Sequence, residues 1–321
     1  MAQSLLFFAG ISNIGLPSSI ASGVRYADKY VVTSDRERIK RIVLPFYQAI
    51  GSVEGDYLLQ DAPGLIFRRD EWSGSSTDIR STLESRMVED LLVVQSLLLS
   101  LWLTKDNAAT VDNAWIFLVD GTKFNVHTSS WAARPSCSNG RFDLVEFSSE
   151  EFRIARTSTN LQFDLDGYIS GGGRPTLLVA NSERFQRFLY LVGGARATAD
   201  VAIKLALYCS ALEAFVSTAQ AELSHQVSER VASLLSPPGP HRLEIFGLMK
   251  EAYGYRSKAV HGATFKGASF ERLREVATRV DGICREISAQ YINAESGLAA
   301  LIQGDSDHLN SRFASMILGH S

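Results

Sequence analysis

The chain has 321 residues, 45% of them hydrophobic, and a formal net charge of −3. This length allows two domains that each bury a core, and the charge excludes a surface that is basic throughout, so contact with nucleic acid would need a local basic patch. Cys137, Cys209 and Cys284 lie far apart and form no CxxC pair. Their spacing argues against a disulfide framework or a zinc knuckle and favours a reducing cytoplasm.

The N-terminal segment MAQSLLFFAGISN has no basic residue before its short apolar stretch, so we predict no signal peptide. The longest apolar run, Leu91–Leu103, has 13 residues and is interrupted by polar side chains. A bilayer span needs roughly 20 residues. We therefore predict a buried helix and no membrane contact.

Short runs rich in β-branched and aromatic residues predict strands in residues 1–180. These runs are Val31–Thr33, Tyr57–Leu59, Leu65–Arg68, Trp115–Val119, Phe142–Phe147, Phe152–Ala155 and Leu177–Val179. Apolar residues recur at steps of three and four from Ser81 to Leu103, which predicts one long helix packed against the sheet. We expect residues 1–180 to form an α+β domain that acts as a sensor or scaffold.

Helical periodicity replaces the strand patterns after Asn181, with Ser182 as the expected N-cap and Glu183 in the first turn. Apolar residues recur at helical spacing within 205–219, 227–234, 243–253 and 270–287, and Pro237–Pro240 interrupts helix propagation. We expect residues 181–321 to form an all-α bundle of about four helices.

The segment YGYRSKAVHG, Tyr253–Gly262, closes one of these helices and places Arg256 and His261 at R-x4-H spacing. An arginine binds phosphate through a planar fork of donors, and a histidine exchanges a proton near neutral pH. Together they supply the groups for phosphodiester cleavage without a metal or a cofactor. The spacing alone is common, so its context decides the interpretation. The structural alternative is an arginine that caps carbonyls and a histidine that closes a helix.

The context resembles HEPN domains, the higher eukaryote and prokaryote nucleotide-binding helical bundles, and especially their Apea-like branch. The resemblance covers roughly residues 185–290 and rests on ALEAF at Ala211–Phe215, ERVASLL at Glu229–Leu235, and YGYRSKAVHG. It implies a metal-independent ribonuclease in which Arg256 and His261 are catalytic and two protomers share one cleft. It also implies a defence or toxin effector restrained until triggered, with the trigger or regulatory partner at the N-terminal domain. Ser257 stands where the family more usually has Asn, Asp or His.

Other residues are candidates to support the site. Glu213 is placed to form a salt bridge with Arg256, although a surface acid is an equal alternative. Tyr255 is a candidate to stack on a base, whereas Tyr253 continues the apolar stripe and is expected in the core. Residues 241–285, which include Lys258, contain nine Lys or Arg against five acids. This excess indicates either a track for an RNA backbone or an ordinary solvated helix face.

Helix geometry favours a dimer. Residues five apart on a helix point about 140° from each other, so Arg256 and His261 do not face the same way within one chain. The arginine side chain can sweep around the helix, the last turn can unwind at Gly262, or a second chain can contribute its own pair. Cleavage by the internal 2′-hydroxyl needs both a base and an acid, and each chain has one motif histidine. We therefore expect a homodimer.

Other readings remain open. The bundle is alternatively a non-catalytic module that binds nucleic acid or a protein, or a structural subunit that only mediates assembly. Asp164 and Asp166 in FDLDG form a DxD pair, but no further ligand at metal spacing accompanies them, so we expect a strand-end turn and not a metal site. Gly171–Gly173 is not followed by GK[ST], so a P-loop is not supported.

Overall fold

The chain divides into two compact units, and an antiparallel sheet region is followed by a mostly helical C-terminal region. The computed structural model describes residues 3–20, 22–72, 78–130, 134–157, 183–218, 222–262, 264 and 268–319. The first unit comprises Met1–Pro135 and Phe142–Asp166, and the second comprises Ser136–Arg141 and Gly167–Ser321. Residues around position 181, where we expected the boundary, lie partly outside the described ranges. The assignment of Ser136–Arg141 to the second unit was not expected.

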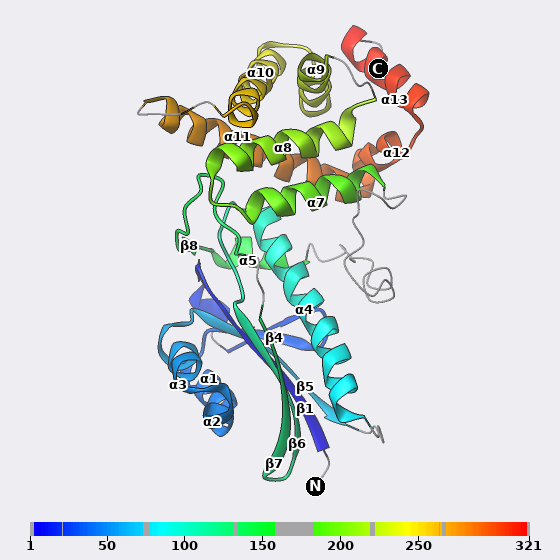
Figure 1. Cartoon of the computed structure of the whole chain (residues 1–321). Helices are drawn as coiled ribbons and strands as arrows, with labels where there is room; N and C mark the ends of the chain where they lie inside the picture. Colours follow the sequence, from blue (N-terminus) through cyan, green and yellow to red (C-terminus); the bar gives the residue numbers. More distant parts are fainter. Residues whose placement is uncertain are drawn as a thin grey trace. The chain divides into compact units, whose positions relative to one another are not determined.

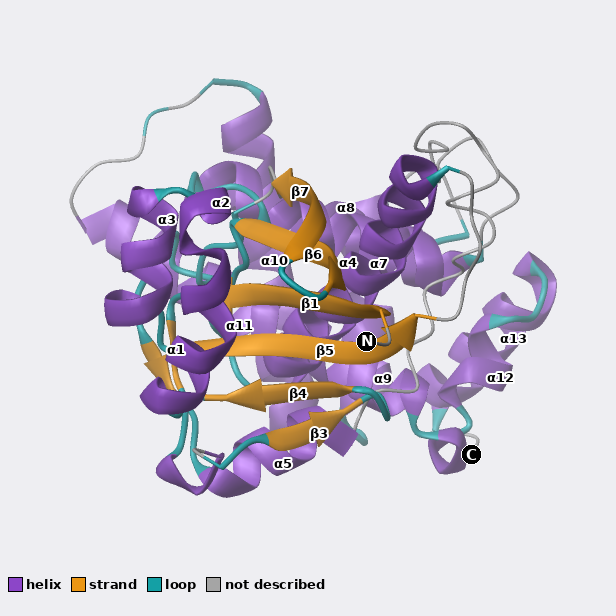
Figure 2. Cartoon of the chain, turned by 90° about the horizontal axis from the view of Figure 1, so that it is seen from below, coloured by secondary structure: helices purple, strands orange, loops and turns teal. Residues whose placement is uncertain are grey.

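A six-stranded antiparallel sheet organises the first unit (Figure 2). Its strand order is β3-β4-β5-β1-β6-β7. The strands are β1 (Gln3–Ile11), β3 (Val24–Tyr26), β4 (Tyr30–Thr33), β5 (Gly64–Trp72), β6 (Asn113–Asp120) and β7 (Lys123–Ser130). A separate parallel pair joins β2 (Ile14–Gly15) to β8 (Val145–Glu146).

Helices cover both faces of this sheet (Figure 1). One face packs against the long helix and the helix that follows β8, and the other against the segment between β4 and β5. The bounds are η1 (Ser18–Ile20), α1 (Arg36–Val43), η2 (Leu44–Phe46), α2 (Tyr47–Ile50), α3 (Ser52–Asp56), η3 (Tyr57–Asp61), α4 (Ile79–Thr104) and α5 (Ser149–Thr157).

The N-terminal apolar stretch is the central strand β1, which the sequence analysis did not predict. Successive side chains of a strand point to opposite faces. Leu5 and Phe7 accordingly join the core beneath α4, whereas Leu6 and Phe8 join the core beneath α1 and η3. Because both faces are covered, β1 is apolar at nearly every position and shows no alternation that would identify it as a strand.

Three of the predicted strands are confirmed. Val31–Thr33 lies in β4, Leu65–Arg68 in β5 and Trp115–Val119 in β6. Of Phe142–Phe147, only Val145–Glu146 forms a strand. Leu177–Val179 lies outside the described residues.

Two predicted strands are wrong. Tyr57–Leu59 belongs to the π-helical segment η3, where the buried Leu58 packs against the sheet. A Cβ at Gly10 would lie 2.6 Å from Leu58 Cδ2, so Leu58 packs closely against β1 at this glycine. Phe152–Ala155 belongs to α5, in which these two residues, three apart, are the buried ones. That spacing is helical, and the short apolar run concealed it.

The predicted long helix is confirmed as α4. It is long and apolar enough to cross a membrane by length and composition alone, and no other described helix is. Half of its most apolar window is buried in the protein, and Leu83, Met87, Leu91 and Val94 pack on the sheet. These contacts are those of a helix in a domain core.

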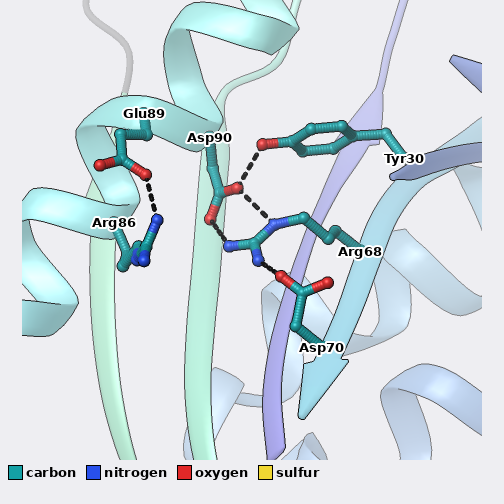
Figure 3. Close-up of polar contacts among 6 residues, drawn as sticks. All are labelled: Tyr30, Arg68, Asp70, Arg86, Glu89 and Asp90. Carbon is teal, nitrogen blue, oxygen red and sulfur yellow. Dashed lines mark hydrogen bonds and ion pairs between the residues drawn. The ribbon is translucent and has the colours of Figure 1, made fainter. Parts of the chain in front are cut away.

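A buried ion pair joins α4 to the sheet (Figure 3). Arg68 on β5 donates from Nε and Nη2 to the two oxygens of Asp90, at 2.8 and 2.9 Å. The Tyr30 hydroxyl donates to the same carboxylate at 2.6 Å, and Arg68 also pairs with Asp70. Burial raises the pKa of Asp90, and the bonds from Arg68 and Tyr30 oppose that rise. Arg68 is therefore the main group that opposes protonation of this carboxyl.

The second unit contains more helices than the four expected. They are α7 (Arg184–Arg196), α8 (Val201–Val216), α9 (Leu223–Leu235), α10 (Pro240–Val260), α11 (Ala268–Ile292), η4 (Ala294–Ser296), α12 (Leu298–Ile302) and α13 (Ser306–Leu318). Helices α8 to α11 are those that the apolar stripes predicted. Glu183 is the N-cap of α7 and forms a capping box with Gln186, one residue later than expected. Pro240, the last residue of the predicted break, is the first residue of α10.

The segment Ser136–Arg141 is bound to this helical unit by buried polar contacts. Ser136 N donates to Arg196 O at 2.8 Å. The fully buried Lys204 on α8 donates to Ala195 O at 2.8 Å and to Ser136 O at 3.3 Å. Ser138 Oγ donates to Thr278 Oγ1 on α11 at 2.9 Å. These bonds hold the segment against α7, α8 and α11.

Candidate functional site

The R-x4-H motif lies at the C-terminal end of α10, as predicted. The helix continues to Val260, and His261 is its C-cap. His261 N donates to Ser257 O at 3.1 Å, and Gly262 adopts the left-handed conformation with φ +77°. Glycine tolerates this conformation because it has no Cβ, and it commonly terminates a helix in this way.

Arg256 is held by Glu213 of α8, and the predicted ion pair is present. Arg256 Nη2 lies 3.2 Å from Glu213 Oε1 and donates to Oε2 at 3.3 Å. The side chain of Glu213 is 16% exposed and that of Arg256 is 33% exposed. A shielded carboxylate therefore orients a guanidinium that still reaches solvent.

Tyr253 packs beneath the same guanidinium. Its ring centroid lies 5.7 Å from Arg256 Cζ, and its hydroxyl donates to Cys209 O at 3.5 Å. Burial raises the pKa of Tyr253, and the neighbouring Cys209 and Glu213 raise it further. The phenol is therefore neutral and supports the position of Arg256. Tyr253 is buried, as the apolar stripe predicted.

The cysteines do not supply a nucleophile near the motif. Cys137, Cys209 and Cys284 are all buried. Burial raises the pKa of Cys209 to about 12, and burial likewise raises the pKa of Cys284. Because the thiolate is the reactive form, these thiols are inert at neutral pH. Arg256 and His261 are therefore the candidates for catalytic groups at this helix end.

His261 and Ser257 are exposed. The helix is regular through Val260, so the separation of about 140° between positions 256 and 261 applies. Arg256 contacts α8, and no hydrogen bond joins it to His261 among the described residues. One chain thus presents the two side chains on different sides of α10.

Lys258 and Tyr255 interact with each other on the surface of α10. Lys258 Nζ lies 5.6 Å from the ring centroid of Tyr255. Lys258 is exposed and Tyr255 is half-buried, and burial raises the pKa of Tyr255. A neutral aromatic ring with a cation over one face suits a base or a phosphate that arrives from solvent.

The basic excess around the motif is largely engaged in ion pairs. Arg272 pairs with both Glu251 and Glu275, and Arg274 pairs with Glu271. Arg279 pairs with Glu244, and Arg285 pairs with Asp281. Lys266 lies outside the described residues. Among the described basic groups on α10, Arg256 and Lys258 are those nearest in sequence to His261. The positive charge available at the motif is therefore local.

No group of three or more potential metal-ligating side chains converges within the part of the chain that the structure describes. Asp164 and Asp166, the DxD pair, lie outside it.

Comparisons with protein-family models, with curated proteins and with solved structures found no match for this chain. The evidence for a function therefore comes from the residues of α8 and α10 themselves.

Proposed function

We propose that the chain is a metal-independent endoribonuclease of the HEPN type that acts as a homodimer. The main observation in support is that an oriented arginine and an exposed histidine both lie in the last turns of one helix. Glu213 and Tyr253 hold Arg256, and the helix end presents His261 to solvent. This arrangement supports a site in which the arginine binds the phosphate and the histidine transfers protons.

In the proposed reaction the 2′-hydroxyl of the RNA attacks the adjacent phosphorus. A base takes the hydroxyl proton, the bond from phosphorus to the 5′-oxygen breaks, and an acid gives a proton to that oxygen. The products are a 2′,3′-cyclic phosphate and a free 5′-hydroxyl. Arg256 stabilises the charge that develops on the phosphoryl oxygens, and His261 acts as general acid or base. Ser257, Lys258 and Tyr255 contact the strand beside the scissile linkage.

A dimer supplies the second proton-transfer group. Each chain has one motif histidine, and the two motif side chains of one chain lie on different sides of α10. Two copies related by a two-fold axis bring His261 of one chain towards Arg256 of the other. Val260, next to His261, is 66% exposed and apolar, which suits burial in such an interface.

Val260→Lys is expected to convert the dimer into a monomer. It places a charge in the apolar contact and leaves the monomer fold intact, because Val260 is 66% exposed. Leu318→Lys is the matched control, since Leu318 is 72% exposed and lies at the end of α13. Light scattering after size-exclusion chromatography measures the mass. A monomeric parent chain, or equal behaviour of both variants, contradicts this interface.

Glu213→Gln is expected to lower kcat for RNA cleavage about tenfold, because a charge-assisted bond of roughly 1.5 kcal/mol no longer orients Arg256. The amide keeps the shape of the side chain, so circular dichroism is expected to stay unchanged. Glu286→Gln on the exposed side of α11 is the control and is expected to have no effect. Unchanged kcat in Glu213→Gln argues that the ion pair is only structural.

The alternative is a non-catalytic bundle that binds nucleic acid or a protein. The observation that favours it is the Arg256–Glu213 pair itself, since this arginine already has a partner within its own chain. Binding of RNA with no turnover is the result that this alternative predicts.

Incubation of the purified chain with bulk RNA, tRNA and single-stranded DNA tests the proposal. We expect cleavage of RNA that a chelator does not inhibit, and no cleavage of DNA. Intact RNA under all conditions, or cleavage that stops when a chelator is added, contradicts it. In the cell, we propose a cytoplasmic defence or toxin effector whose sheet-containing unit senses the trigger or binds the regulatory partner.

A further inference from the structure

A hollow of about 470 Å³ lies between the segment Ser136–Arg141 and α11, apart from the R-x4-H motif. Three guanidinium groups and two carboxylates line it, from Arg141, Arg274, Arg279, Glu271 and Glu275. All of these residues belong to the helical unit. Arginines converging on one hollow are a common feature of phosphate-binding sites.

A tight turn delivers Arg141 to this hollow. Gly140 N donates to Cys137 O at 2.9 Å, and Cys137 N donates to Arg141 O at 2.8 Å. Gly140 has φ +80°, and a Cβ there would lie 2.4 Å from Ala199 O. Only glycine fits this position, and Ser138 ties the turn to α11 through Thr278. The backbone that carries Arg141 is thus fixed in place.

The acidic residues of the hollow pair with other arginines, so Arg141 is available to bind an anion. Glu271 is paired with Arg274 at 3.2 Å, and Glu275 is paired with Arg272 at 2.9 Å. Arg141 is exposed, and its side chain has no ion pair or hydrogen bond among the described residues. Both carboxylates are therefore neutralised locally, and Arg141 adds a positive charge that the protein itself does not compensate.

Arg274 is held in a defined plane beside Arg141. Its Cζ lies 4.5 Å from the ring centroid of Phe270, and its Nη1 binds Glu271. Its Nε is shielded from solvent and donates to no partner among the described residues. A guanidinium held in this way loses little side-chain freedom on binding an anion.

We propose that this hollow binds a backbone phosphate of the RNA strand, away from the scissile linkage, with Arg141 as the main contact. The inference rests on the proposed function, since it assigns a position to the same substrate. Contacts to phosphate carry affinity and register without sequence information. Arg141 is therefore a positioning residue, which sets where the strand lies relative to Arg256 and His261.

The packing of α10 against α11 supports a single RNA strand that contacts both the R-x4-H motif and the hollow at Arg141. Arg272 of α11 binds Glu251 of α10 through two bonds of 2.8 and 2.7 Å, and Arg279 binds Glu244. Residues later in α11 thus pair with residues earlier in α10, so the helices run antiparallel. The first turns of α11 lie at the same end as the motif, and Arg274 is about 9 Å along the axis from the start of α11.

The test is RNA binding measured in the His261→Ala background, in which cleavage is expected to be slow. Fluorescence anisotropy of a labelled single-stranded RNA is followed from about 50 to 200 mM salt. Arg141→Gln is expected to weaken binding about fivefold at roughly 0.1 M salt and to reduce the slope of log K against log salt by about 0.7. Arg141→Lys, which keeps the charge, is expected to retain the slope.

Arg312→Gln is the matched control, because Arg312 is an exposed arginine on α13 of the same unit. It is expected to bind RNA like the parent. Equal binding by Arg141→Gln and the parent overturns the inference, and so does equal competition by polyglutamate, which would indicate an acidic peptide as the ligand. If the wild-type chain cleaves RNA and Arg141→Gln binds normally, this inference alone fails. If binding depends on Arg141 and nothing is cleaved, the nuclease proposal alone fails.

Discussion

His261→Ala is expected to slow RNA cleavage by about 10²- to 10⁴-fold, the usual contribution of a general acid or base. The substitution removes the only motif side chain in the proposed site that transfers protons near neutral pH. The fold is expected to be unchanged, because the side chain is exposed and the helix end is formed by backbone bonds and by Gly262. Initial rates on a labelled RNA, with chelator present, measure the effect.

His308→Ala is the control for this variant. His308 is an exposed histidine on α13 in the same unit. If replacing any exposed histidine of this unit lowered activity, both variants would be slow. We expect the parent rate from His308→Ala. A His261→Ala enzyme within a few-fold of the parent contradicts the role assigned to His261.

Arg68→Met is expected to destabilise the sheet-containing unit by about 3–5 kcal/mol, because it leaves the Asp90 carboxylate buried without its partner. Asp90 is fully buried and Arg68 is 6% exposed. All four tryptophans of the chain, Trp72, Trp102, Trp115 and Trp131, lie within the first unit, so tryptophan fluorescence in a denaturant titration reports its unfolding selectively. Arg69→Met is the control, since this neighbouring β5 arginine is exposed.

The pH dependence gives a second readout for Arg68→Met. Burial raises the pKa of Asp90, and Arg68 opposes that rise, so the variant is expected to have a folded-state pKa further above the unfolded value. The folded state then binds more protons, and the free energy of unfolding falls as pH rises through this range. We expect the deficit of the variant to shrink as pH is lowered from 7. A second change, Asp90→Leu, is expected to restore much of the stability. An undiminished deficit in the double variant contradicts this explanation.

The order of strands and helices was partly predictable because some elements bury one face. The apolar stripes of α4 and α10 repeat at helical spacing, and the sequence YGYRSKAVHG contains the glycine that ends α10. β1 was not recognised because both of its faces are buried. The strand β7 was missed because its side chains are mostly exposed and polar. Short apolar runs such as Tyr57–Leu59 fit a strand or a helix equally well, so the run alone does not identify the helical form.

In the candidate site too, features that depend on local sequence patterns were predictable, and features that depend on packing between distant segments were not. The Glu213–Arg256 pair was predictable because both residues lie next to apolar stripes of helices that must pack together. The hollow around Arg141 was not, because its arginines come from segments more than 130 residues apart in sequence, and Ser138 and Thr278 are joined across 140 positions. No local pattern in Ser136–Arg141 indicates that this turn packs against α11.

The most direct test of the central claim is cleavage of an RNA that contains a single 2′-deoxynucleotide, compared with the unmodified RNA, in the presence of a chelator. If Arg256 and His261 promote attack by the internal 2′-hydroxyl, the unmodified RNA is cut to a 2′,3′-cyclic phosphate and the linkage after the deoxynucleotide stays intact. Equal cleavage at the deoxynucleotide, or no cleavage until a divalent metal is supplied, would contradict the account.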